Sequence, residues 1–222
     1  MYREITAKVH REAPEGTYLY VLVPKESLTG ELNKLSTNGI LKGELRIDDG
    51  RRITAEQRKK AYATIADIAA HTGYPPHEMK DIMKYHYMGV TGDDYFSFSK
   101  CSISTARRFI SHILDFALQW DIPLMDNLLE RTDDINAALY SCLMRKKCIL
   151  CGLEGGLHHA EDRVGMGRDR EEIIHLGMRV MCLCWEHHDE AHIIGQDTFN
   201  KTYHVYGIEA NEAICKVWGL NH

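Results

Sequence analysis

The spacing of apolar and polar side chains predicts that the chain begins with β-strands. Apolar and polar residues alternate over residues 2–10, and residues 17–24 are rich in β-branched and aromatic side chains before Pro24. This alternation is typical of strands, because successive side chains point to opposite faces of a sheet. A third short strand is expected over residues 41–47, ahead of the Asp-Asp-Gly turn at residues 48–50.

Helical periodicity follows these strands. Apolar residues recur every three or four positions between Thr54 and Gly73, and Thr54 with Gln57 forms a capping box. A short alternating segment at residues 94–103 predicts one more strand. Three further helices are expected, over residues 76–88, 104–120 and 133–147.

The apolar faces of the first three helices predict the core of this part of the chain. Its members are Ala61, Tyr62, Ile65, Ile68, Ala69, Met79, Ile82, Met83, Phe109, Ile110, Ile113, Leu114, Ala117 and Trp120.

A change in composition near residue 145 predicts two domains in an α+β protein. Strands and then helices occupy residues 1–145, whereas residues 146–222 are rich in loops, cysteine, histidine and glycine. We expect a first domain of strands plus helices, followed by a small domain that a structural zinc ion stabilises.

The composition predicts a cytosolic protein. Of the 222 residues, 44% are apolar and 27% charged, which is typical of soluble globular proteins. No apolar run approaches the ~20 residues that cross a membrane, so no membrane association is expected. The N-terminal residues also lack the apolar core of a signal peptide. Because the cytosol is reducing, disulfides are not expected, and Cys101, Cys142 and Cys215 are interpreted as isolated thiols.

The net charge of −5 offers no general argument for binding nucleic acid. Basic residues are nevertheless clustered locally, and such clusters are most often solvated faces. The clusters are Arg51, Arg52, Arg58, Lys59 and Lys60; Arg107 and Arg108; Arg145, Lys146 and Lys147; and Arg163, Arg168 and Arg170.

Two short motifs in the C-terminal part predict a structural zinc site. Cys148 and Cys151 form a CxxC pair, and Cys184 and His187 form a CxxH pair. Two such pairs are typical of a zinc-ribbon site that joins two loops with little core of their own. Cys182 is an alternative to Cys184.

The remaining histidines indicate a second metal site. His158 and His159 are adjacent, and His188 and His192 lie on one face of a helix. At about 100° per residue, that face is turned roughly 90° from Cys184 and His187, so one helix can serve two sites. Three neutral imidazoles can hold a divalent ion, and a further histidine can take a proton from water. This combination favours hydrolysis of phosphodiesters.

The order of CxxC, His-His and LCxxHHxxxH over residues 146–208 resembles the HNH (ββα-metal) endonucleases, in particular those of phages. The resemblance implies that His159 is the general base and that His158, His188 and His192 bind the catalytic metal, which would be Mg²⁺, Mn²⁺, Ni²⁺ or Zn²⁺. It also implies a structural Zn²⁺ on Cys148, Cys151, Cys184 and His187.

The middle residue of the HNH motif, usually Asn or His, is here Arg179. His175 is an alternative brace for the catalytic loop. The loop between the two expected strands carries Arg163, Arg168 and Arg170, which would suit contacts to phosphate.

The N-terminal part resembles the lambda-type phage recombination mediators called Orf or NinB. The resemblance covers residues 48–69, 95–99 and 104–124, with Arg52, Gln57 and Lys60 matching the polar entry to a helix. It implies a homodimer that binds DNA, preferably single-stranded or branched, and that assists single-strand-binding protein and recombinase. The expected location is the cytoplasm of a phage-infected or lysogenic bacterium. The DNA contacts would be Arg51, Arg52, Lys59 and Lys60.

Three functions are compatible with these patterns. The first is a recombination-associated, metal-dependent HNH endonuclease. The second is a single-strand DNA-binding mediator whose HNH module binds DNA with little or no cleavage, which Arg179 favours. The third is a purely structural zinc module for protein contacts. The sequence leaves open the activating metal, the preferred DNA and the oligomeric state.

Overall fold

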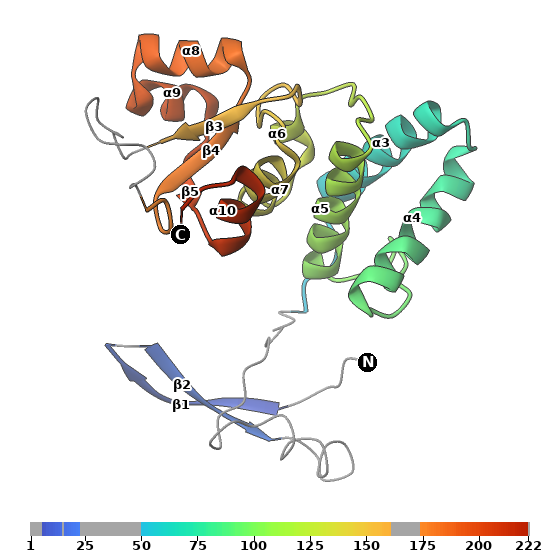
Figure 1. Ribbon diagram of the computed structural model, residues 1–222. Helices are drawn as coiled ribbons and strands as arrows, with labels where there is room; N and C mark the ends of the chain where they lie inside the picture. The colour runs from blue at the N-terminus through green and yellow to red at the C-terminus, as the bar shows by residue number, and fades with distance from the viewer. Residues whose placement is uncertain (1–5, 15, 23–49, 161–173, 222) are drawn as a thin grey trace. The chain divides into compact units, whose positions relative to one another are not determined.

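The computed structural model describes residues 6–14, 16–22, 50–160 and 174–221, which fall in two compact units. In the unit formed by residues 1–49 and 92–94, strand β1 (Thr6–Ala13) pairs antiparallel with β2 (Gly16–Leu22) (Figure 1). These strands confirm the first two expected from alternation. The third expected strand, residues 41–47, lies outside the described residues.

The second unit begins with three helices that contact one another: α3 (Ala55–Thr72), α4 (Pro76–Thr91) and α5 (Ile103–Gln119). The expected capping box is present at the start of α3. The backbone N–H of Gln57 donates to Thr54 Oγ1 at 3.0 Å, and the Thr54 N–H donates to Gln57 Oε1 at 3.1 Å. Gly73 ends the helix with a left-handed φ of 79°, which glycine adopts at no steric cost.

The core of the three-helix part is aromatic as well as aliphatic. Tyr87, Phe96, Phe98 and Phe109 form a group of edge-to-face ring contacts with centroids 5.1–5.8 Å apart. Most of the expected core positions are buried. The exceptions, Tyr62, Ile82 and Trp120, are exposed by 48%, 39% and 62%. These three were wrongly assigned, because they lie at the edges of the helices' apolar faces or, for Trp120, at the C-cap.

Residues 94–103 do not form the expected strand. Phe96 and Phe98 are buried between exposed neighbours, which reproduces the alternation of a strand over residues 95–99. A turn interrupts the segment, because the N–H groups of Lys100 and Cys101 both donate to the carbonyl of Ser97. Among the described residues the segment makes only a single bridge, between Ser102 and Arg52, so it inserts side chains into the helical core without joining a sheet.

The helices α6 (Leu128–Arg131) and α7 (Ile135–Arg145) lead to a three-stranded antiparallel sheet. Its strand order is β3 (Gly156–His159), β4 (Arg179–Leu183) and β5 (Ile208–Glu209). The helices that follow β4 are α8 (Trp185–Ile194), α9 (Gln196–Tyr203) and α10 (Glu212–Trp218). Helices and a small sheet together confirm the α+β class.

Strand β4 is covered on both faces. Its four residues from Val180 to Leu183 are buried, and neighbouring side chains on a strand point to opposite faces. Helix α8 contacts β3 and β4, while α7 contacts β4 and β5 (Figure 1). Residues on both sides of position 145 thus share one compact unit. The expected division at 145 stays a prediction about function.

In the part of the chain that the structure describes, no helix combines the length and the apolar character needed to cross a membrane.

Candidate metal centres

The first cluster joins the two short motifs. The ligand atoms of Cys148, Cys151, Cys184 and His187 all lie within 4.8 Å of one another. The Cys151 and Cys184 sulfurs are 3.6 Å apart, and His187 Nδ1 lies 3.1 Å from Cys184 Sγ. Since a Zn–S bond is about 2.3 Å, two sulfurs of a tetrahedral site should be about 3.8 Å apart. The donor set and its spacing therefore fit zinc.

Local backbone structure creates this cluster. Residues 147–154 form a tight turn in which the Gly152 N–H donates to the Cys148 carbonyl, and Gly152 has a φ of 71°. Cys184 is the N-cap of α8, one turn before His188 and three residues before His187. Burial raises the pKa of the Cys148 thiol, partly opposed by backbone N–H groups that include that of Cys184. A buried thiol of this kind loses its proton when a metal ion binds to the sulfur.

Cys182 lies outside this cluster. It is fully buried on β4, and burial, with Cys148 as the next cause, raises its pKa to about 12. Cys101, Cys142 and Cys215 are also buried free thiols.

The second cluster consists of three histidines. His158 on β3 meets His188 and His192 on α8, with ring centroids 4.7 and 5.3 Å from its own. One ligand atom from each ring lies within 4.8 Å of the other two. Burial lowers the pKa of His158, and its hydrogen bond to the Gln196 side-chain oxygen partly opposes this shift. The pKa of His188 is lowered by burial and then by His192. Neutral imidazoles are the form that binds metal.

Helix α8 separates the two clusters. His188 and His192 lie one turn apart on one side, whereas Cys184 and His187 join the cysteine turn. Because β3 pairs with β4 and α8 follows directly, the order of elements around the histidines is strand, strand, helix.

His159 lies on the other side of β3 from His158, since neighbours on a strand alternate. Its ring is half-buried and lies 5.4 Å, centroid to centroid, from the ring of His175. His175 is 8% exposed, and its backbone N–H donates to the Asn221 carbonyl at 2.9 Å.

Comparison with known proteins assigns a family. Residues 27–221 match the family described as "Putative HNHc nuclease". The chain belongs to this HNH nuclease family. No curated protein and no solved structure matches it. The matched region of this HNH family member begins well before residues 146–208, which carry the motif, and so includes the three-helix part.

Arg179, expected at the middle position of the HNH motif, is the first residue of β4. Its Nη1 donates to the Gly207 carbonyl at 3.4 Å. Gly207 directly precedes β5, the strand that pairs with β4. The backbone carbonyl of Arg179 accepts from the N–H of Ala160 at 2.8 Å, next to His159. The main chain of Arg179 thus holds the end of β3, which carries His158 and His159. Its side chain holds the backbone at Gly207.

The predicted DNA-contacting residues fall into three groups. Arg51, Arg52 and Lys59 are exposed, and Arg52 Nη1 donates to the Lys100 carbonyl at 2.7 Å. Lys60 is half-buried, and its Nζ donates to the Thr132 carbonyl at 2.7 Å. The third group lies outside the described residues: Arg163, Arg168 and Arg170.

Sequence reasoning missed Gln196 and Asn200, which lie beside the histidine cluster. His158 Nε2 is 2.6 Å from Gln196 Oε1, and Gln196 Nε2 is 2.8 Å from Asn200 Oδ1. Their positions, four residues apart on α9, were the available signal, since such a pair shares one face of a helix.

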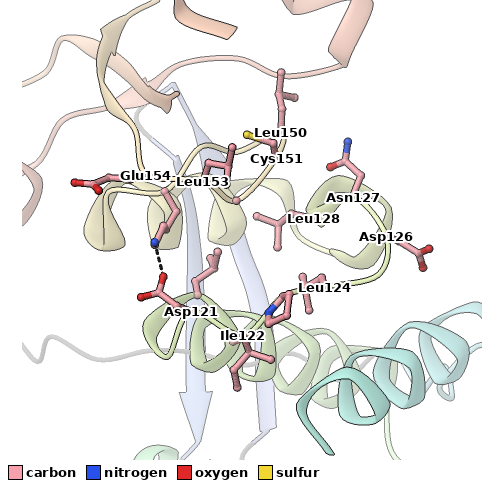
Figure 2. A pocket seen from close by; sticks show the side chains of 15 residues that line it. Asp121, Ile122, Leu124, Asp126, Asn127, Leu128, Leu150, Cys151, Leu153 and Glu154 are labelled. Atoms are coloured by element: carbon pink, nitrogen blue, oxygen red, sulfur yellow. Dashed lines mark ion pairs between the residues drawn. The ribbon is translucent and has the colours of Figure 1, made fainter. Parts of the chain in front are cut away.

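A pocket of about 540 Å³ lies beside the cysteine turn (Figure 2). Leu150, Cys151 and Leu153 form one wall, and Ile122 and Leu124 from the segment after α5 lie opposite. An ion pair between Lys147 and Asp121 closes one end. None of the histidines of the second cluster lines this pocket, which therefore belongs to the cysteine side of the unit.

Proposed function

We propose that this HNH family member is a metal-dependent endonuclease that hydrolyses DNA phosphodiesters. The observation that carries the proposal is the convergence of His158, His188 and His192 within 4.8 Å, on the ββα elements, with His159 next to His158 along β3. Family membership supports nuclease chemistry, and the cluster supplies the donors that such chemistry needs.

In this proposal the three clustered histidines hold the catalytic ion, which is Mg²⁺, Mn²⁺, Ni²⁺ or Zn²⁺. When bound, a divalent ion would stabilise the negative charge that develops on the scissile phosphate and the leaving oxygen. Cys148, Cys151, Cys184 and His187 hold a structural Zn²⁺, supported by their spacing and their soft donor atoms.

His159 is the proposed general base, accepting a proton from water on a ring nitrogen. We assign its bracing to His175. The two rings lie 5.4 Å apart, and His175 is buried, whereas the Arg179 side chain reaches the Gly207 carbonyl. The buried ring of His175 can limit the orientations of the His159 ring by contact.

Plasmid nicking in Mg²⁺, Mn²⁺ or Ni²⁺ tests this function. His159→Ala should lower the cleavage rate by about 10²–10⁴-fold, the usual contribution of a general base. His71→Ala is the matched control, because His71 is exposed on α3. Unchanged cleavage by His159→Ala would exclude His159 as the base.

The second candidate is a DNA-binding recombination mediator whose HNH module cleaves little or not at all. The surface of α3 favours it, because Arg58 and Lys59 are exposed and Tyr62, one turn from Arg58, is exposed by 48%. Cations beside an exposed aromatic ring suit single-stranded DNA, whose bases stack on such rings.

Several further proposals accompany this second candidate function. The DNA is single-stranded or branched, the chain is a homodimer, and single-strand-binding protein and recombinase are partners in a phage-infected or lysogenic bacterium. Residues 1–145 would then serve DNA binding and residues 146–222 the nuclease chemistry. Arg51, Arg52 and Lys59 would contact phosphate on one part, and Arg163, Arg168 and Arg170 on the other.

A further inference from the structure

Gln196 is the residue at which α8 gives way to α9. Gly195, with a φ of 81°, joins the two helices, so Gln196 directly follows the helix that carries His188 and His192. Its half-buried side chain makes two contacts. Oε1 lies 2.6 Å from Nε2 of His158, and Nε2 lies 2.8 Å from Oδ1 of Asn200.

These two contacts determine the direction of the hydrogen bonds. An amide nitrogen only donates, so Gln196 Nε2 donates to Asn200 Oδ1, and the amide oxygen is left facing His158. An amide oxygen only accepts, so His158 Nε2 must carry the proton in this contact. A neutral imidazole protonated on Nε2 has its lone pair on Nδ1.

We propose that Gln196 is a positioning residue that holds His158 as the Nε2–H tautomer and so presents Nδ1 to a divalent metal. This inference rests on the proposed function, because the metal site of His158, His188 and His192 is itself a proposal. Histidines that bind metal donate their second ring N–H to an acceptor, which orients the ring and selects the tautomer. Asn200 acts one step further out, by keeping the Gln196 amide from turning over.

The experiment uses the full chain with its cysteine site loaded with zinc. Nitrogen-15 NMR of the imidazoles reports the His158 tautomer before any further metal is added. Calorimetric titration with Ni²⁺ then reports the affinity of the histidine site. Gln196→Ala should lose the single Nε2–H tautomer and bind Ni²⁺ about 10-fold more weakly, within the range for outer partners of metal ligands. Gln196→Glu, which keeps an oxygen acceptor, should retain both properties.

Thr198→Ala is the matched control, because Thr198 is exposed on the same helix. The proposal is overturned if Gln196→Ala keeps the tautomer and the Ni²⁺ affinity of the unmodified chain, or if Thr198→Ala weakens binding equally. If the unmodified chain binds no Ni²⁺ at the histidines but shows an Nε2–H tautomer that Gln196→Ala removes, the proposed metal site is wrong. The assignment of the tautomer to Gln196 then stands.

Discussion

At the scale of single residues, neighbouring side chains of the same type differ in what they can bind. Cys184 follows β4 as the N-cap of α8, with its sulfur 3.6 Å from that of Cys151. Cys182, two residues earlier, is fully buried and is not one of the four clustered zinc-type ligands. Residue type and position along the chain are almost the same, yet only Cys184 belongs to the group of ligand atoms within 4.8 Å of one another.

We expect Cys184→Ala to lose the proposed structural zinc and Cys182→Ala to keep it. Removing one of four ligands leaves an open, weakened site, whereas the buried Cys182 thiol has no part in binding. Metal content after dialysis, measured by atomic absorption, decides the matter. Equal zinc loss in the two variants would mean that the thiols exchange roles.

At the scale of elements, the contact between the cysteine turn and β4 depends on one glycine. A Cβ at Gly155 would lie 2.7 Å from the Leu183 carbonyl oxygen and 2.8 Å from Cys182 Sγ, closer than real Cβ contacts allow. At the adjacent Gly156, a Cβ would meet nothing within 4 Å. The strand β4 can approach the turn only because residue 155 has no side chain.

Gly155→Ala should lower the free energy of unfolding by about 1–3 kcal/mol, the usual cost of overpacking. Gly156→Ala provides the control one residue away and should change stability much less. Urea denaturation of both variants and the unmodified chain measures the difference. A loss in Gly156→Ala as large as that in Gly155→Ala would show that backbone flexibility, and not the close approach, matters here.

The elements also show why one sequence pattern misled. Residues 94–103 alternate as a strand does, yet they turn at Ser97 and place Phe96 and Phe98 among the helices. Alternation reports which side chains are buried, whereas a strand requires a neighbouring backbone to pair with. The helices α3, α4 and α5 were predictable because their hydrogen bonds are local.

At the scale of the whole molecule, the net charge of −5 means that the DNA binding we propose would need a local basic surface. The exposed cations Arg58 and Lys59 on α3 form the candidate surface in the described residues, beside Tyr62. Phosphate contacts release counterions, so each one makes binding more sensitive to salt.

A double variant, Arg58→Ala with Lys59→Ala, should weaken binding to single-stranded DNA and reduce the salt dependence by about one to two counterions. Fluorescence anisotropy at several salt concentrations provides the measurement, and Lys216→Ala, exposed on α10, is the control. If affinity and salt slope match those of the control, DNA is not bound on this face of α3.

The sequence by itself determined the donor atoms and their grouping by local spacing. The CxxC and CxxH pairs, the adjacent histidines and the pair one helical turn apart are all short-range patterns, and local geometry follows from them. Only the tertiary structure decided what lies beside each group. Packing between elements brought His158 to α8, the Arg179 side chain to Gly207, and Gln196 to His158. Those contacts join residues far apart in the chain or on different elements, and no periodicity in the sequence encodes them.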